Sequence, residues 1–259
     1  MTESEATNQS GRRSRIRREV LDSGFARIEQ LATDHGVSTM TIHRDLDVLE
    51  QQGWVRKVRG GATSTPSALL EGSVRMRMAD AAAEKSRLAE HALALVSPGD
   101  VVAIDDSTTA LAVAGGLPEL GPFTVVTNFL SVVNRLSGEP GIQLIGLGGD
   151  YHPSYDAFLG LHTADMAAVM RSDVLFMSTT AVVDGHCLHR SQETIQVKRA
   201  LMRTAARRVL LVDHTKFERR ALHELVPLTE FDVVLSDPGL PHDERAKLLE
   251  AGVNLRIAE

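Results

Sequence analysis

Cysteine is almost absent from this sequence, because Cys187 is the only one in 259 residues. One cysteine cannot form a disulfide within its own chain, so we expect a protein of the reducing cytoplasm. Uninterrupted apolar runs of the ~18–20 residues that a membrane-spanning helix needs are also lacking. The first residues, MTESEATNQSGRRSR, contain no apolar segment of the kind found in secretory signals. These absences argue against a secreted or membrane-spanning protein.

An overall positive charge, which would favour nucleic acid, is lacking as well, because the formal net charge is -6. The charge is nevertheless unevenly distributed along the chain. Residues 11–63 carry ten basic and seven acidic side chains, whereas residues 64–259 carry 18 basic and 25 acidic ones. A basic segment joined to an acidic remainder suggests that the basic part binds a polyanion.

Short helical patterns follow a polar tail, residues 1–11, that we expect to be disordered. Helices are predicted from Arg12 to Leu21 and from Arg27 to His35, and a third begins after Ser38, which can cap it. Their apolar stripes are Ile16, Val20 and Leu21, then Ile28, Leu31 and Ala32, then Ile42, Leu46 and Leu49. The segment WVRKVRGG that follows alternates like the arm of a β-hairpin. Residues 12–63 therefore read as a winged helix-turn-helix DNA-binding domain.

The third helix has the composition of a helix that reads DNA. Opposite its apolar stripe we expect short hydroxyl side chains and one arginine near the N-terminal end. Hydroxyl groups can bind phosphates, and the Arg44 guanidinium can bind guanine in the major groove. The candidate DNA contacts are Ser38, Thr39, Thr41, His43 and Arg44 on the helix, and Arg56, Lys57 and Arg59 on the wing, which suit phosphate. The alternatives are a solvated Arg44–Asp47 pair and a three-helix module that binds only protein.

The remainder of the chain has the pattern of an α/β domain. Residues 64–79 are predicted to form a linker with a short helix, and residues 80–259 a second domain that begins with a helix from Lys85 to Val96. Seven apolar runs then alternate with helical stretches, at 101–105, 123–127, 142–147, 173–178, 208–213, 232–236 and 254–258. Apolar strands separated by helices predict a doubly wound, mainly parallel sheet covered on both faces.

Three hydroxyl side chains, Ser107, Thr108 and Thr109, follow the first of these strands and open a helix. Ligands bind at this place in open α/β sheets, and the positive end of the helix together with the hydroxyls would attract an anion. The alternative is that Ser107 or Thr108 only caps the helix, which needs no ligand. The residues alone leave these two interpretations equally open.

A cluster of metal-capable side chains occurs in DGHCLH, residues 184–189. Asp184, His186, Cys187 and His189 lie within six residues of one another. Structural zinc sites usually combine two such clusters, and the sequence contains no convincing second one. We therefore expect a loop that covers a ligand pocket, with no bound metal and no cofactor.

The segment STMTIHRDLDVLEQQGWVRKVRGGA closely resembles the winged-helix signature of the DeoR family of bacterial transcriptional regulators. One departure is His43, where the family usually has another arginine. The resemblance implies a larger domain that is similar to ribose-5-phosphate isomerase and senses a phosphorylated sugar or related metabolite. It also matches residues 105–109 to the family's Asp-Ser-Gly-Thr-Thr phosphate loop. Here Asp106 replaces a small residue and Ser107 the glycine, and the added carboxylate would repel a phosphate.

Further positions match the family's strand ends and the lysines that approach the substrate phosphate in the isomerases. The resemblance thus implies an effector site formed by Lys85, Asp105, Ser107, Thr108, Thr109, Asn128, Gly149, Tyr151 and Lys216. We expect these residues to lie on one edge of the sheet.

The same resemblance bears on catalysis. In the isomerases a carboxylate supplies the base, and Lys198 matches that position here, where a protonated lysine is a poor base. Glu193, about one turn earlier, leaves an active sugar-phosphate isomerase with a DNA-binding appendage as the alternative. We expect instead a non-enzymatic repressor of sugar or carbohydrate metabolism genes. It would bind double-stranded operator DNA as a homo-oligomer, a dimer or tetramer, with an affinity that changes when the phosphorylated sugar binds.

Overall fold

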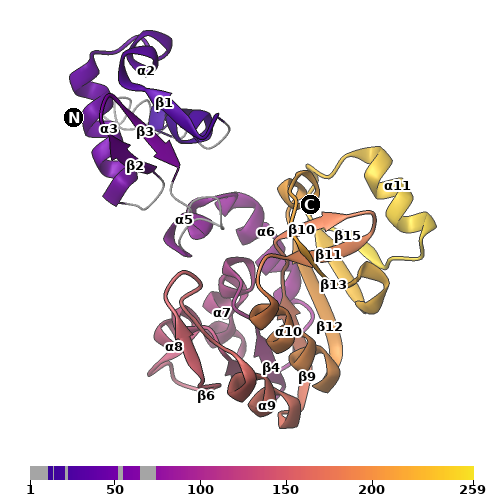
Figure 1. The fold of residues 1–259 in the computed structure, drawn as a ribbon. Helices are drawn as coiled ribbons and strands as arrows, with labels where there is room; N and C mark the ends of the chain where they lie inside the picture. Colours follow the sequence, from indigo (N-terminus) through magenta and orange to yellow (C-terminus); the bar gives the residue numbers. More distant parts are fainter. Residues whose placement is uncertain (1–10, 14, 21–22, 52–54, 65–73) are drawn as a thin grey trace. The chain divides into compact units, whose positions relative to one another are not determined.

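The computed structural model of the protein describes residues 11–13, 15–20, 23–51, 55–64 and 74–259. The chain divides into two compact units, Met1–Arg77 and Met78–Glu259, and Figure 1 shows the course of the chain through both. Each unit has its own secondary structure and its own buried residues, so each is described by itself.

The N-terminal unit combines short helices with a three-stranded antiparallel sheet. Residues 11–13 and 15–20 are helical, and helices α2 (Ile28–Asp34) and α3 (Thr39–Gln51) follow. The sheet has the strand order β1–β3–β2, with β1 at Phe25–Arg27, β3 at Gly61–Ser64 and β2 at Val55–Val58. The predicted helices and β-wing are therefore confirmed. Parts of the predicted segments lie outside the described residues, namely most of the polar tail (1–10), Ser14 and Leu21 of the first helix, Trp54 of the wing segment, and 65–73 of the linker.

The sequence does not predict strand β1, and the second helix begins at Ile28 instead of Arg27. Arg27 belongs to β1 and pairs with Gly61 of β3. A Cβ atom at Gly61 would lie 2.5 Å from the carbonyl oxygen of Ala26, so glycine is needed for this close approach. A strand of three residues has too little alternation to be recognised, and it forms because β3 offers it a partner.

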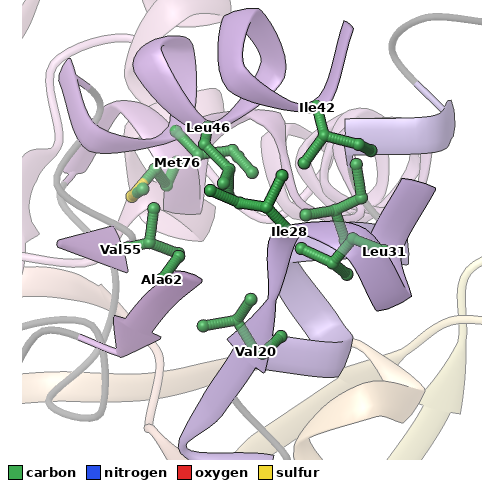
Figure 2. Packing of buried hydrophobic residues seen from close by; sticks show 11 residues of the cluster. Val20, Ile28, Leu31, Ile42, Leu46, Val55, Ala62 and Met76 are labelled. Atoms are coloured by element: carbon green, nitrogen blue, oxygen red, sulfur yellow. The ribbon is translucent and has the colours of Figure 1, made fainter. Parts of the chain in front are cut away.

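The core of this unit is built from the predicted apolar stripes. On α3, Ile42, Leu46 and Leu49 are buried at the i, i+4, i+7 spacing of one helical face. The same cluster contains Ile16, Val20, Ile28 and Leu31 from the other helices, with Val55, Ala62 and Met76 (Figure 2). Burying one large aliphatic side chain contributes ~1.5–3 kcal/mol. This packing fixes which face of α3 remains at the surface.

The C-terminal unit is built on a seven-stranded sheet in which every neighbouring pair of strands is parallel. In sheet order the strands are β15 (Leu255–Ile257), β14 (Val233–Ser236), β12 (Ala205–Val212), β9 (Ser172–Met177), β4 (Val101–Ile104), β5 (Phe123–Thr127) and β6 (Ile142–Gly146). They correspond to the seven predicted apolar runs. Central strands such as β4 and β14 are almost completely buried, which is why their sequences are continuously apolar.

Helices connect the strands and cover the sheet. They are α6 (Ala82–Leu93), α7 (Thr108–Leu120), α8 (Leu130–Leu136), α9 (Leu161–Val169), α10 (Gln192–Thr204) and α11 (His242–Glu250), with α5 (Val74–Ala79) before them and 3-10 turns η1 (His214–Glu218) and η2 (Leu228–Glu230). Helix α6 packs against α7, and α9 against α10. This parallel α/β architecture is the predicted one. Within the described ranges, no helix combines the length and the hydropathy that a bilayer span requires.

Two small antiparallel sheets complete the unit. They are the hairpin β7–β8 (Asp150–His152 and Ala157–Leu159) and the sheet β10–β11–β13 (Ala181–Val183, His186–His189 and His223–Pro227). Residues 184–189 are therefore not the predicted loop. Asp184 and Gly185 form a tight turn with φ angles of 49° and 74°, and β11 then pairs with β10 and with β13. An Asp-Gly pair between strands is a hairpin signal, and the strand itself depends on the distant partner β13.

Candidate DNA-binding surface and effector site

Ser38 caps helix α3, the candidate DNA-reading helix. Its Oγ accepts a hydrogen bond from the Thr41 backbone N–H at 3.2 Å, and the two hydroxyl oxygens are 3.0 Å apart. Gly36, with φ of 61°, provides the left-handed turn between α2 and α3. The first turn of α3 is thus held at the surface, where the exposed Ser38 and Thr39 can meet a phosphate.

The predicted contact residues of α3 lie on its solvent side. Ser38, Thr39 and Arg44 are exposed, and Thr41 and His43 are half-buried. Met40, which is not among the predicted contacts, has a side chain that is 62% exposed in the same turn. An apolar side chain at this place can contact the methyl group of thymine. The sequence signal that could have revealed this exposure is that Met40 falls outside the apolar stripe of α3.

Two acidic residues of α3 attach the wing to the helix. The Lys57 Nζ forms an ion pair with Asp47, and the Lys57 backbone N–H donates to Glu50 Oε1 at 2.7 Å. The structure therefore pairs Asp47 with Lys57, where the sequence alternative paired it with Arg44. Arg56 and Arg59 are exposed. In the free protein these two arginines of the wing are thus accessible to a polyanion, whereas Lys57 attaches the wing to α3.

Two other arginines serve the interior of this unit. The Nε atoms of Arg12 and Arg13 bind the two carboxylate oxygens of Asp45 at 2.7 and 2.8 Å, and Asp45 is fully buried. Charge-assisted hydrogen bonds of this kind are among the stronger ones, and here they tie the first helix to α3. Because both arginines neutralise a buried acid, the basic surface is smaller than the charge count predicts.

In the second unit, Asp105 organises the turn from β4 into α7. Its Oδ1 accepts a hydrogen bond from the Ser107 N–H and its Oδ2 one from the Ser178 N–H, both at 3.0 Å. Ser107 Oγ caps α7 by accepting from the Ala110 N–H at 3.1 Å. The capping role considered for Ser107 is therefore present, and two N–H groups of this turn are already used within the protein.

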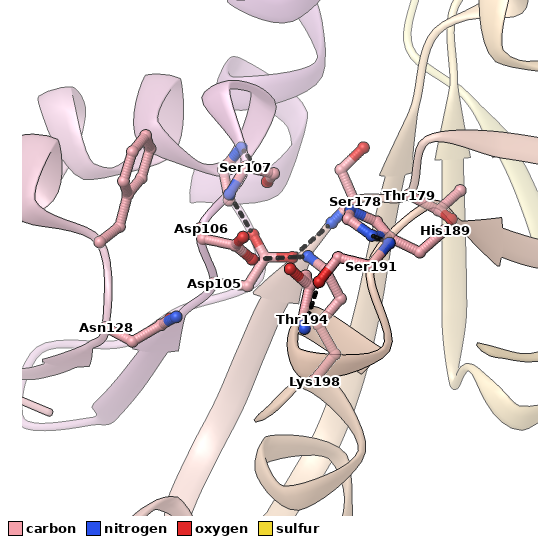
Figure 3. Close-up of polar contacts among 12 residues, drawn as sticks. Asp105, Asp106, Ser107, Asn128, Ser178, Thr179, His189, Ser191, Thr194 and Lys198 are labelled. Atoms are coloured by element: carbon pink, nitrogen blue, oxygen red, sulfur yellow. Dashed lines mark hydrogen bonds and ion pairs between the residues drawn. The ribbon is translucent and has the colours of Figure 1, made fainter. Parts of the chain in front are cut away.

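Lys198, on α10, supplies the positive charge at the centre of this site. Its Nζ forms ion pairs with Asp105 Oδ2 and, at 3.0 Å, with Asp106 Oδ1, and all three side chains are buried (Figure 3). Burial alone would lower the pKa of Lys198, but the two carboxylates hold that pKa above its ordinary value. Lys198 therefore stays charged.

Lys198 is predicted from the sequence only as the replacement of a catalytic base, and its ion pairs with Asp105 and Asp106 are not predicted. Lys198 lies four residues after Thr194, and both belong to the buried face of α10. A lysine on the apolar face of an amphipathic helix was the signal that could have revealed a buried charge.

A second buried cluster lies at the carboxyl end of β12. It contains Lys85 from α6, Lys216 from η1 and Asp213, each less than a tenth exposed. Burial, and then the nearby Lys216, lower the pKa of Lys85 to about 8, although Asp213 and Asp80 act in the opposite direction. The structure thus brings together the two lysines that the sequence assigned to the effector.

The electrostatics of this second cluster favour an anion. Burial would raise the pKa of Asp213, but the charge of Lys216 and a hydrogen bond from Thr215 hold that pKa below its ordinary value. Three positive groups, Lys85, Lys216 and Arg219, act on one another here together with the carboxylates of Asp213 and Asp80. The positive excess can attract a phosphate or a carboxylate.

Three more predicted effector residues lie, like Asp105, at the carboxyl edge of the parallel sheet. Thr108 and Thr109 begin α7, and Asn128 follows β5, which is the neighbour of β4. All three are buried. The Asn128 Nδ2 donates to the carbonyl oxygen of Phe158 at 2.9 Å, which fixes the orientation of the amide.

Gly149 and Tyr151 have local partners instead. A Cβ atom at Gly149 would lie 2.0 Å from Thr163 Oγ1, so glycine permits the close approach of α9. The Tyr151 hydroxyl donates to Asp156 Oδ1 at 2.8 Å, and this hydrogen bond raises the pKa of Tyr151. Both contacts have an explanation without a ligand.

Glu193 is poorly suited to act as a catalytic base. It is exposed at the start of α10, where its Oε2 accepts a hydrogen bond from Ser191 Oγ at 2.9 Å. A hydrogen bond from its own backbone N–H, followed by that from Ser191, lowers the pKa of Glu193. A carboxylate with a lowered pKa is a weaker base.

The segment 184–189 has no arrangement suited to a metal ion. Burial raises the pKa of Cys187 to about 12, so the thiol stays protonated, whereas the thiolate is the form that binds metals. In the part of the chain that the structure describes, no three His, Cys, Asp or Glu side chains are grouped so that they could hold a metal.

Comparison with known families identifies both units. The family described as "DeoR-like helix-turn-helix domain" matches residues 12–68. The family described as "DeoR C terminal sensor domain" matches residues 80–238. The first match implies DNA binding, and the second assigns the α/β unit to a class of sensor domains.

Several known proteins are similar to this chain. The HTH-type transcriptional regulator YgbI of Escherichia coli strain K12 is 32% identical over 248 residues, which cover 96% of this chain and 97% of that protein. The glycerol-3-phosphate regulon repressor of the same strain is 28% identical and covers 96% of this chain and 99% of its own. A solved ribose 5-phosphate isomerase A from Methanocaldococcus jannaschii is 18% identical, covers 51% of this chain and 53% of its own, and has a TM-score of 0.37.

The similar full-length proteins are named as regulators of transcription and not as enzymes. The chain is accordingly a non-enzymatic regulator, and the alternative of an active isomerase is set aside. Both family matches and the extent of the similarity lead to the same assignment: the chain belongs to the DeoR family of transcriptional regulators.

Proposed function

We propose that the protein is a repressor of carbohydrate metabolism genes whose affinity for operator DNA changes when a phosphorylated sugar or related metabolite binds to its C-terminal domain. The observation that carries this proposal is the pair of buried charged clusters, one around Lys198 and one around Lys85 and Lys216. Buried ion pairs add little to stability compared with apolar packing, and perturbed charges gather at functional sites. Their place at the carboxyl edge of a parallel sheet supports a ligand site.

One cluster carries a positive excess and the other a negative one, and this difference suggests the orientation of the bound ligand. Only β9 separates β4 from β12, so the two strand ends are ~10 Å apart by strand spacing. The positive cluster suits the phosphate. We assign the opposite end of the ligand to Asp105, Ser107, Thr108, Thr109 and Asn128. Gly149 and Tyr151 are assigned to the rim of the effector site. The name of the glycerol-3-phosphate regulon repressor supports a phosphorylated effector.

The DNA-binding function is assigned to residues 12–63, and effector binding with oligomerisation to residues 80–259, joined by the linker 64–79. Arg44 and His43 would contact base edges, while the phosphate contacts come from Ser38, Thr39, Thr41, Arg56, Lys57 and Arg59. A homo-oligomer would place two α3 helices on repeated half-sites. The effector can shift DNA affinity only by its differential affinity for two arrangements of the protein, typically ~1–3 kcal/mol of coupling.

DNA binding is tested with the full-length protein. Selection from fragmented genomic DNA supplies the operator, and fluorescence anisotropy measures its affinity. Arg44→Ala should weaken operator binding roughly tenfold or more, since one bidentate arginine–guanine contact contributes ~1–3 kcal/mol. Arg171→Ala, which removes an exposed arginine from the C-terminal unit, is the control and should leave affinity unchanged. Equal losses in both variants, or failure to enrich any sequence, would refute sequence-specific binding by α3.

Effector control is tested by repeating the affinity measurement with a panel of sugar phosphates. A compound that changes operator affinity for the wild-type protein but not for Lys216→Met supports the sensor function. If no compound of the panel changes operator affinity, the result argues against a phosphorylated sugar as the effector. A reporter gene fused to the selected operator shows whether the protein represses or activates transcription. Loss of a repressor raises expression, and loss of an activator lowers it.

A further inference from the structure

The cluster around Lys198 contains polar atoms that the fold leaves unsatisfied. Ser178 Oγ, Thr194 Oγ1 and Asn128 Oδ1 are buried and have no hydrogen-bond partner among the residues that the structure describes. Buried polar atoms without a partner are rare because they have lost water and gained nothing in return. Three of them at one place indicate groups that await a partner.

These three atoms lie around the ion pairs of Lys198. Thr194 and Lys198 share the buried face of α10, and the Ser178 N–H donates to the same Asp105 carboxylate that Lys198 binds. Asn128 follows β5, next to β4, and its side chain extends toward Asp106 in Figure 3. The three unsatisfied atoms therefore belong to one site and come from three separate segments of the chain, after β9, on α10 and after β5.

The charge of this site disfavours an anion. Two carboxylates, Asp105 and Asp106, share one ammonium group, that of Lys198, so the group of three carries a net negative charge. A further negative charge would be repelled strongly in buried surroundings, where the effective dielectric constant is low. The N-terminus of α7 offers little compensation, because the N–H groups of Ser107 and Ala110 already donate within the protein.

Neutral hydroxyl groups fit the same site. A hydroxyl can donate to a carboxylate or to Asn128 Oδ1, and it can accept from Ser178 or Thr194. One sugar or polyol chain carries several hydroxyls at successive carbons and can therefore satisfy several of these atoms at once. Each satisfied atom removes an existing penalty in the unliganded protein.

We propose that the Asp106–Lys198 pair, with the hydroxyl groups that adjoin it, forms a subsite for the uncharged, hydroxyl-bearing end of the effector. Asp106 excludes ligands that carry a carboxylate or a second phosphate at that end. The effector class is thus the monophosphate of a neutral sugar or polyol. This inference rests on the proposed function, since it needs a phosphate held at the other end by Lys85 and Lys216.

Matched ligand pairs test the exclusion. Sorbitol 6-phosphate and 6-phosphogluconate differ only at C1, which carries a hydroxyl in one and a carboxylate in the other, and ribitol 5-phosphate with 5-phosphoribonate makes a shorter pair. Calorimetry on the full-length protein should give at least ~10-fold tighter binding of the polyol phosphate in the pair that fits. Asp106→Asn keeps the shape and removes the charge, so it should bring this ratio toward one. Glu119→Gln, at the exposed far end of α7, is the matched control and should leave the ratio unchanged.

A second variant tests the unsatisfied hydroxyls without relying on the choice of ligand. Thr194→Val replaces the Thr194 hydroxyl by a methyl group of nearly the same shape. If that hydroxyl awaits a ligand, the unliganded variant melts at the same temperature as the wild type or higher, and its affinity for the polyol phosphate falls. A lower melting temperature of the unliganded variant would show that the hydroxyl is structural and would overturn the inference.

The outcomes separate this inference from the proposed function. Sugar-acid phosphates that bind as tightly as polyol phosphates, or a ratio that Asp106→Asn does not change, would overturn the inference while the sensor function stands. Binding by none of the four compounds and by none of the sugar phosphates in the DNA assay would count against the sensor function, and the inference would fall with it.

Discussion

Replacing Lys198 by methionine tests how strongly the buried ion pairs hold α10 to the sheet. Methionine has an unbranched side chain of similar length, so the change removes a charge without opening a large cavity. Asp105 and Asp106, which are 0% and 3% exposed, would remain side by side without their common cation. Removing one partner of a buried pair destabilises a protein by ~3–5 kcal/mol. Two backbone N–H groups still bind Asp105, so we expect a loss near the lower limit, ~3 kcal/mol.

The sign of the pH dependence follows from the carboxyl groups left behind. Burial and mutual repulsion in the variant should raise the pKa of one carboxyl group above its unfolded value of ~3.9. A group with a raised folded pKa lowers stability above that pKa and has no effect below the unfolded one. The stability difference between Lys198→Met and the wild type should therefore be largest near neutral pH and should shrink as the pH falls toward ~4.

Chemical denaturation of the full chain measures this loss and contains its own control. The only tryptophan, Trp54, belongs to the N-terminal unit, whereas far-UV circular dichroism follows both units. Lys198→Met should shift the dichroism transition of the C-terminal unit and leave the fluorescence transition in place. Lys247→Met removes a surface lysine that lies 3.3 Å from Glu244 and should lower stability by less than ~1 kcal/mol. A loss as small as that of Lys247→Met, or one that persists unchanged in acid, would refute the reasoning.

Two further predictions concern the wing and the positive cluster. Asp47→Asn should release Lys57 for a phosphate contact, so operator affinity should rise and the slope of its logarithm against salt concentration should steepen by ~1; an unchanged slope in anisotropy titrations would contradict this. An anion bound beside Lys85 should raise the pKa of Lys85 above its present value of about 8. Effector binding near pH 8 should then take up roughly half a proton, which calorimetry in buffers of different ionisation enthalpy would detect, and Lys85→Met should abolish the uptake.

The secondary structure is largely accessible from the sequence because its signals are local. The spacing of Ile42, Leu46 and Leu49 predicts α3, and continuous apolar runs predict the parallel strands. Strands β1 and β11 escape the same reasoning because each depends on a partner from a distant segment, β3 and β13 respectively. The Asp184-Gly185 turn could be predicted from the sequence as a hairpin turn, but the segment with its metal-capable side chains was predicted to be a loop.

The candidate sites are less accessible, because the type of a charged residue does not reveal its environment. Lys57 was predicted at the surface of the wing, and it forms an ion pair with Asp47. Lys198 was predicted only as the replacement of a base, and it is the buried centre of three charges. The DNA contacts and the effector residues are predictions that the binding experiments above test.

The sequence by itself determined the class of the protein, namely a basic winged helix-turn-helix followed by a parallel α/β domain. Periodicity, capping residues and turn glycines are properties of neighbouring residues, and they need no knowledge of the rest of the chain. Only the tertiary structure decided that Lys198 meets Asp105, 93 residues away, and that Arg12 and Arg13 neutralise Asp45. Such pairs arise from strand order and helix packing, which bring distant residues together and exclude water from between them, so no local pattern encodes them.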